Sequence, residues 1–120
     1  GQRVRGAGRL VLARMQKARK LMQQNRIDEF YDETLHAMMG YVSDKLNIPV
    51  SDLTKEKMMD EFHAQQVPPE LSDHFTQLLS DCELFRFSQN KNESNSTESV
   101  YNDVVDVISK LDSILKKKKK

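Results

Sequence analysis

Three histidines and one cysteine are the residues of this chain best suited to metal binding or nucleophilic catalysis: His36, His63, His74 and Cys82. Asp32 and His36 are four residues apart, a spacing that places two ligands on one face of a helix, as metal sites require. A metal site also needs a second pair of ligands, and the sequence offers none at a matching spacing. We therefore expect the histidines to lie on a solvated surface, with no metal and no cofactor.

Cys82 lies in a run whose apolar residues, among them Leu78, Leu79 and Phe85, recur at helical spacing. A thiol on the apolar face of a helix is usually an inert part of the core. Catalysis by this thiol would need a histidine beside it and a third group to orient the imidazole. The sequence also lacks a glycine-rich phosphate loop. We therefore expect no catalytic residues, and a protein that is not an enzyme.

The elements that must position these residues are predicted to be helices. Apolar positions recur every three or four residues, and no segment alternates with the period of two that a half-buried strand requires. The predicted organisation is a disordered basic start at 1–8, a helical domain at 9–87, a flexible polar linker at 88–97, a C-terminal amphipathic helix at 98–115 and a lysine tail at 116–120. Within the helical domain we expect helices at about 9–25, 28–46, 55–65 and 69–87. The predicted fold class is all-α, a small bundle of about five helices with a basic N-terminal helix.

Particular residues mark the ends of these helices. Pro49 ends the second helix, because the residue before a proline disfavours helical angles. Thr54 is typical of an N-cap, and Pro69 fits the first turn of the fourth helix. Gly40 lies inside the second helix, where a small residue would allow close contact with another helix. The last helix has an apolar stripe over barely two heptads, so we expect it to pack on the body rather than form a long coiled coil.

Four methionines leave two interpretations open: Met38, Met39, Met58 and Met59. Surfaces rich in methionine can form adaptable binding grooves. At helical spacing, however, methionines are more often ordinary core residues, and this is the interpretation that we favour.

The charges are sorted along the chain, although the formal net charge is only +1. The first 27 residues contain no acid and eight bases, namely Arg3, Arg5, Arg9, Arg14, Lys17, Arg19, Lys20 and Arg26. Residues 28–115 contain all 18 acids and only six bases, which gives this part of the chain a charge of −12. Five more lysines form the tail at 116–120. The two ends are therefore cationic and the helical middle is anionic.

Three interpretations of the basic segments are open. A basic residue beside anionic lipid is worth about 1 kcal/mol, which favours a membrane surface. Alternatively, the basic first helix packs against the acidic body. Nucleic acid is the least favoured partner, because the acidic body would repel phosphates and no aromatic residue is interleaved with the basic ones.

Two stretches resemble a known family: FYDETLHAMMGYVSDKLNIPVSDLTKEKMMDEF at 30–62 and LLSDCELFRFS at 78–88. With the basic helix before them and the helix at Tyr101 after them, residues 9–115 are similar to the C-terminal cytoplasmic domain of the BatD family of Bacteroides-type aerotolerance (Bat) operons. The motif residues that carry this resemblance are Tyr41, Pro49, Cys82, Glu83, Arg86 and Phe87. Glu83 and Arg86 are three residues apart and could pair along the helix. The chain departs from the family at Ser88, where a small residue followed by proline is expected, and this affects how sharply the chain turns.

The resemblance implies a parent protein with a signal peptide, a large periplasmic β-rich part and one transmembrane helix. This chain would then be a fragment on the cytosolic side of the inner membrane. The start at Gly1 without Met indicates an excised fragment, so the lack of an apolar run of about 20 residues says nothing about the parent protein. The basic first segment agrees with a position beside the membrane, and the single cysteine agrees with its reducing side. The implied partners are the von Willebrand A-domain, TPR and MoxR-type AAA+ proteins of the same operon, and the family has no catalytic residues to transfer. We therefore expect a non-catalytic scaffold domain involved in oxygen or stress tolerance; the alternative is a soluble helical nucleic-acid-binding or regulatory domain.

Overall fold

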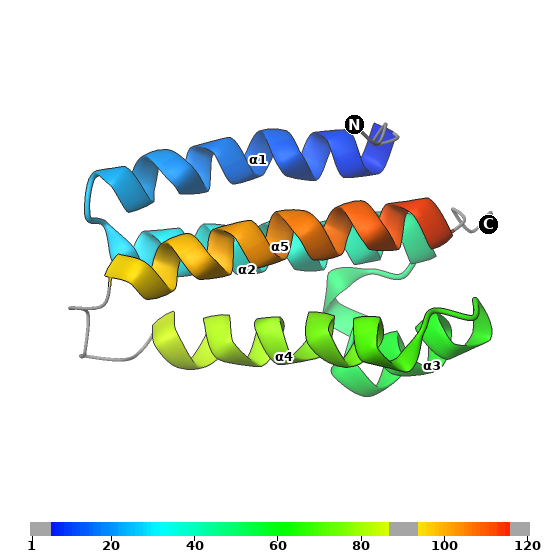
Figure 1. Ribbon diagram of the computed structural model, residues 1–120. Helices are drawn as coiled ribbons and strands as arrows, with labels where there is room; N and C mark the ends of the chain where they lie inside the picture. Colours follow the sequence, from blue (N-terminus) through cyan, green and yellow to red (C-terminus); the bar gives the residue numbers. More distant parts are fainter. Residues whose placement is uncertain (1–5, 87–93, 116–120) are drawn as a thin grey trace.

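The computed structural model describes residues 6–86 and 94–115, which form five α-helices and one short 3-10 helix (Figure 1). In chain order these are α1 (Gly6–Gln23), α2 (Ile27–Leu46), the 3-10 helix η1 (Val50–Asp52), α3 (Lys55–Ala64), α4 (Pro69–Arg86) and α5 (Ser94–Ile114). Neither described range contains a strand. The predicted all-α fold class, a small bundle of about five helices, is confirmed.

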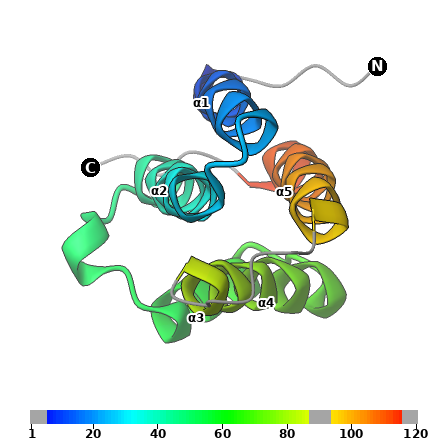
Figure 2. The same ribbon diagram turned by 90° about the vertical axis from the view of Figure 1, so that its left-hand side faces the viewer.

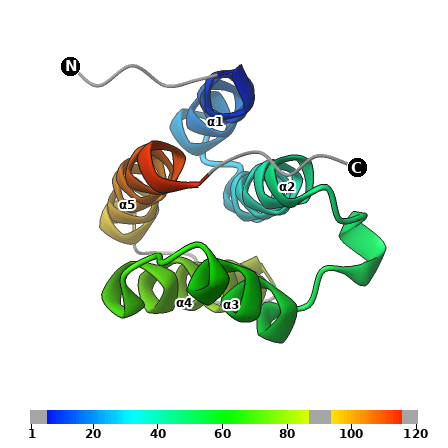
Figure 3. The same cartoon turned by 90° about the vertical axis from the view of Figure 1, so that its right-hand side faces the viewer.

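The helices form three layers, which are clearest when the bundle is viewed from its ends (Figures 2 and 3). One outer layer is α1, the middle layer is α2 with α5 beside it, and the other outer layer is α3 with α4. α1 packs chiefly on α2 and also on α5, whereas α4 packs on both α2 and α5 and supports α3. The C-terminal helix therefore packs on the body, as its short apolar stripe predicted.

One hydrophobic core runs through all three layers. Its largest fully buried side chains include Phe30, Phe62, Phe75, Met15, Met38 and Met58. The rings of Phe62 and Phe75 meet edge to face with their centroids 5.6 Å apart, and this contact attaches the short helix α3 to α4. Because α2 has buried residues along its whole length and packs on α1, α4 and α5, it is the central element of the bundle.

The four methionines are divided between the core and its edge. Met38 and Met58 are completely buried, so the core interpretation is confirmed for these two. Met39 and Met59 are only partly buried, and Met39 packs against the margin of the same core.

The residues at the helix ends behave as their types predict. The hydroxyl of Thr54 accepts a hydrogen bond of 3.0 Å from the backbone N–H of Lys57, which confirms the N-cap of α3. At the end of α2, Asn47 adopts a left-handed conformation with φ of 56°, and its N–H donates to the carbonyl of Ser43. Pro49 then carries the chain into η1.

Two predicted boundaries are wrong. Residues 6–8 were expected to be disordered but form the first turn of α1, because extending an existing helix is much easier than nucleating one, even through glycine. Residues 94–97 were expected to be linker but belong to α5. Thr97 is 2% exposed and lies four residues before Tyr101 and seven before Val104, so it continues the core-facing stripe as a polar member that the sequence pattern hid. The rest of those two segments, 1–5 and 88–93, lies outside the described residues.

Gly40 has no close neighbour, so its expected role in helix contact is wrong: a Cβ added there meets no atom within 4 Å. An alanine would fit this space and would restrict the unfolded chain more than glycine does. We expect Gly40→Ala to raise the free energy of unfolding by about 0.5–1 kcal/mol, measured by urea denaturation. A loss of stability in this variant would show that the position is crowded after all.

A buried polar cluster, formed by Tyr41, Lys45 and Asp112, joins α2 to α5. The Nζ atom of Lys45 lies 2.9 Å from Oδ1 of Asp112, and the hydroxyl of Tyr41 donates a 2.9 Å hydrogen bond to the same oxygen. Lys45 and Asp112 are each only 4% exposed. Burial, followed by the charge of Asp112 and its hydrogen bond, raises the pKa of Tyr41 well above its usual value, so the hydroxyl keeps the proton that it donates.

Candidate functional site

The candidate site is the outward side of α1, which the packing of the bundle separates cleanly from the inward side. Val11, Met15 and Ala18 are buried at spacings of four and three, and they attach one edge of α1 to the rest of the bundle. Because α1 is an outer layer by itself, the opposite side of the helix faces away from the protein (Figures 1 and 2). Side chains on that side are available to a partner along the length of the helix.

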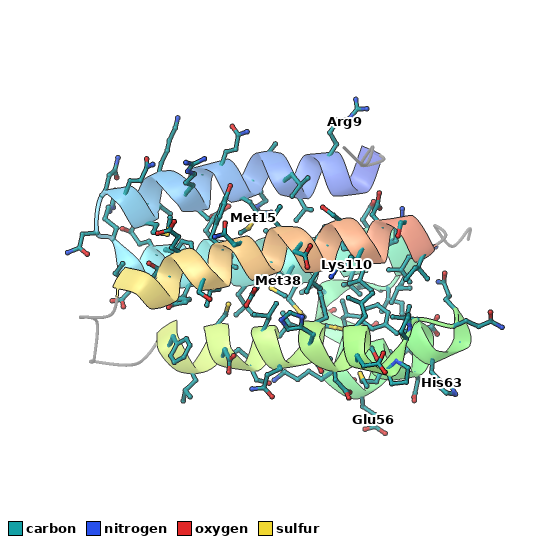
Figure 4. All side chains as sticks on the ribbon, viewed as in Figure 1. Arg9, Met15, Met38, Glu56, His63 and Lys110 are labelled. Carbon is teal, nitrogen blue, oxygen red and sulfur yellow. The ribbon has the colours of Figure 1, made fainter. Side chains whose placement is uncertain are left out.

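Four exposed bases cover this outward side, and we call them the cationic face: Arg9, Lys17, Arg19 and Lys20. Arg9 and Lys20 are eleven residues apart, close to three helical turns, so they lie on the same side of α1. Lys17 lies one turn before Lys20 on that side, and Arg19 lies at its edge. Figure 4 shows the side chain of Arg9 pointing away from the bundle. No acid of α1 interrupts this face, because the helix contains none.

Two other bases of the same segment pair with acids of α2 instead. Nε of Arg14 lies 2.9 Å from Oε1 of Glu33, which is a direct contact between α1 and the acidic body. Arg26, between the two helices, donates a 2.8 Å hydrogen bond to Glu29. The interpretation that the basic helix packs on the acidic body therefore holds for Arg14 alone among the described bases of α1, and apolar contacts make up the rest of the docking.

The four residues of the cationic face make no ion pair with any acid in the described part of the chain. Their charges are therefore not neutralised within the fold. Arg3 and Arg5, which the sequence analysis placed in the same basic group, lie outside the described residues. Within residues 6–86 and 94–115, the fold therefore presents a cationic surface without an acidic partner.

The opposite layer has the opposite charge. α3 and α4 together contain seven acids and only three bases, Lys55, Lys57 and Arg86. Glu56 and His63 lie on this side of the molecule in Figure 4, far from Arg9. The sorting of charge along the sequence has therefore become a sorting of charge across the bundle, with a cationic outer helix on one side and an acidic outer layer on the other.

The histidines are exposed and do not gather into one site. His36 lies 3.7 Å from Asp32 on the same face of α2, which confirms the geometry predicted from their spacing. His74 lies 3.9 Å from Asp103, a contact between α4 and α5 that the sequence does not reveal. His63 is exposed near the end of α3. Among the described residues, no three His, Cys, Asp or Glu side chains lie where they could hold a metal ion.

Cys82 is completely buried in α4, among the apolar residues that surround it in the core. Burial, and then the charges of Asp81 and Glu83, raise the pKa of Cys82 to about 12. The thiol therefore holds its proton more tightly in the folded protein than in the unfolded chain, and its contribution to stability is lost as pH rises from about 9 toward that value.

We expect iodoacetamide at pH 8 to alkylate Cys82 at least about 100-fold more slowly in the folded protein than in urea. The raised pKa alone lowers the thiolate fraction about 1,000-fold, since each unit of pKa is a factor of ten. The rate is followed by intact mass. Equal rates in the folded and the urea-unfolded protein would contradict the burial of this thiol.

The residues that carried the family resemblance have separate places in the structure. Tyr41 belongs to the buried polar cluster, and Pro49 is exposed before η1. Glu83 forms an ion pair with Lys55 of α3, so its carboxylate links two helices rather than only lying along α4. The side chain of Arg86 and all of Phe87 lie outside the described residues, so the Glu83–Arg86 pair stays a prediction.

Sequence reasoning missed the buried cluster, because it treated Lys45 and Asp112 as ordinary surface charges. Two signals pointed to it. Lys45 follows Tyr41 and Val42 on the apolar side of α2, and Asp112 lies four residues after Ile108 in the apolar stripe of α5. A single charge at such a position on each of two helices, with opposite signs, is a pattern that predicts a buried pair.

The fold and this surface define a class of protein: an all-α bundle whose outermost helix displays an unpaired cationic face. Comparisons of the chain with protein-family models, with curated proteins and with solved structures find no match. No helix in the described part of the chain is long and apolar enough to cross a membrane. The similarity to the BatD family therefore stays a prediction from the sequence.

Proposed function

We propose that this chain is a non-catalytic interaction domain that binds an anionic membrane surface through the cationic face of α1 and presents its acidic body to protein partners. The observation that carries this proposal is the placement of Arg9, Lys17, Arg19 and Lys20 on the outward side of the outermost helix, where no acid of the described segments pairs with them. Each base near anionic lipid contributes about 1 kcal/mol, so four on one face are enough for measurable attachment.

The binding expected from this face is electrostatic. The apolar residues of α1 that would insert into lipid, such as Val11 and Met15, are already buried against α2 and α5. The helix therefore lies on a headgroup layer rather than in it, and the attachment weakens with salt because exposed charges are screened within about 8 Å at physiological ionic strength.

The resemblance to BatD adds a cellular location and a set of partners to this proposal. It supports a position on the cytosolic side of the inner membrane, where the basic start of the chain would lie beside lipid. The acidic layer of α3 and α4 would then face the cytosol and bind the von Willebrand A-domain, TPR or MoxR-type AAA+ partners. The role would be that of a scaffold in a complex for aerotolerance.

Sedimentation with lipid vesicles tests the membrane part of the proposal. We expect the protein to pellet with vesicles that contain phosphatidylserine, to stay in solution with pure phosphatidylcholine, and to be released from the anionic vesicles at 1 M salt. Equal behaviour with both vesicles would overturn the proposal. Tight, salt-dependent binding of a DNA or RNA probe without vesicle binding would favour the nucleic-acid alternative instead.

A further inference from the structure

An apolar hollow opens between α2, α3 and α4, on the side of the molecule away from α1. It has a volume of about 300 Å³ and is lined by Leu35, Met39, Leu53, Met58 and Leu79, among other residues. The ion pair between Lys55 and Glu83 spans its edge and joins α3 to α4. We call this hollow, with its edge, the α2–α4 groove.

We propose that the α2–α4 groove binds the apolar side chains of a basic amphipathic helix from a partner protein. This inference deepens the proposed function, because it names the chemistry of the partner that the acidic body would hold. It does not depend on lipid binding, since the groove and the cationic face use different residues.

The size and lining of the groove suit a side chain of this kind. A cavity of about 150 Å³ already accommodates a benzene ring, so this hollow has room for one or two leucine or phenylalanine side chains. Its aliphatic and thioether lining offers no buried charge to an incoming group. Met39, which is only partly buried, can change rotamer to fit ligands of different shape.

The negative charge of this part of the chain favours a positively charged partner. Between residues 27 and 86 the chain has thirteen acids against four bases, a net charge of −9. Near the groove, Lys55 is neutralised by Glu83. Asp52 and Glu56 are exposed next to the lining residues Leu53 and Lys55, and with the exposed base Lys57 they leave one net negative charge there. A helix whose polar side is basic would be attracted to this surface, whereas an acidic helix would be repelled. Anchors in an apolar groove with basic flanks are the pattern of helix-in-groove recognition.

The probe for this proposal is a fluorescent synthetic peptide that forms a helix, with leucines on one face and lysines on the other. Two matched peptides separate the contributions: one has glutamates in place of the lysines, and the other has serines in place of the leucines. We expect saturable anisotropy with the first peptide and at least tenfold weaker binding of each of the other two. Equal binding of the serine peptide would show attraction by charge alone and would overturn the proposal.

A pair of variants places the binding in the groove. Met39→Lys puts a charge into the hollow and should weaken the leucine–lysine peptide at least tenfold. Leu84→Lys is the matched control, because Leu84 is 68% exposed and does not line the groove, and we expect a change of less than twofold. Equal losses in the two variants would overturn the assignment. Circular dichroism shows whether each variant is folded.

A measurement on the unaltered protein keeps the test independent of any variant. Titration with the peptide should shift the methyl NMR signals of Met39 and Leu79 and leave those of Met15 and Val11 unchanged. Shifts confined to Met15 and Val11 would contradict the proposal.

Sedimentation equilibrium tests whether a second copy of this chain occupies the groove instead. A dimer that Met39→Lys dissolves would assign the groove to a second copy of this chain and overturn the proposal. Vesicle binding should be unchanged in Met39→Lys. A failure of the groove proposal can therefore be distinguished from a failure of the lipid proposal.

Discussion

Asp112→Ala should lower the free energy of unfolding by about 3–5 kcal/mol, more than any other single substitution considered for this chain. The carboxylate accepts from Tyr41 and pairs with Lys45 at 2.9 Å, and both Lys45 and Asp112 are 4% exposed. Removing the carboxylate leaves a buried ammonium group without its counter-ion, and that loss is far more costly than the loss of one surface ion pair. Urea denaturation monitored by circular dichroism gives the difference.

A matched exposed pair provides the control for this result. Asp106 pairs with Lys110 at 3.0 Å on the same helix α5, but both side chains are more than half exposed. Asp106→Ala should therefore change stability by less than about 0.5 kcal/mol. If Asp112→Ala and Asp106→Ala lower the free energy of unfolding equally, the Lys45–Asp112 contact is solvated and the buried cluster does not exist as described.

Replacing the whole cluster separates specificity from stability. A triple variant, Tyr41→Phe with Lys45→Met and Asp112→Leu, removes the polar groups of all three residues together, so neither the hydroxyl of Tyr41 nor the ammonium of Lys45 is left buried without the carboxylate. We expect it to recover most of the stability that Asp112→Ala loses, because apolar replacements of buried ion pairs are often neutral or stabilising. That recovery would indicate that the cluster serves to fix how α5 lies against α2 rather than to add stability.

The sequence was informative wherever a local pattern determines the structure. Apolar spacing predicted the helices, and Thr54 predicted an N-cap that the hydrogen bond to Lys57 confirms. The absence of acids among the first 27 residues predicted the positive charge of α1.

The sequence was uninformative where distant segments meet. Tyr41 and Asp112 are 71 residues apart, and only the packing of α2 on α5 brings them together. The α2–α4 groove is formed by three elements, none of which has a hollow by itself. Thr97 shows the same limit at a helix end, because a low-complexity segment looks like linker until tertiary contacts bury one of its polar residues. Long-range packing, which a local window cannot show, decided each of these features.

Replacing Arg9, Lys17, Arg19 and Lys20 together by Gln should weaken binding to phosphatidylserine vesicles by about 10²- to 10³-fold. Each of these bases contributes about 1 kcal/mol beside anionic lipid, and every 1.4 kcal/mol is a factor of ten. The fold should persist, because all four side chains are exposed and the buried edge of α1 is unchanged. Sedimentation over a range of lipid concentrations gives the change in affinity.

Vesicle binding should depend on where the bases lie in the fold rather than on the total charge of the chain. Lys57→Gln and Lys110→Gln each remove one exposed base, from α3 and α5, and each should alter vesicle binding less than twofold; Lys57 is the stricter control, because Lys110 is paired with Asp106 at 3.0 Å. Arg14→Gln should cost less than Lys17→Gln, because the guanidinium of Arg14 is already paired with Glu33 at 2.9 Å. Replacing Lys17 and Lys20 by Arg keeps the charge and should keep the binding. If the variant with all four Gln substitutions loses less than threefold in vesicle affinity, α1 is not the surface that contacts lipid. The same conclusion follows if the Lys57 and Lys110 substitutions lower the affinity as much.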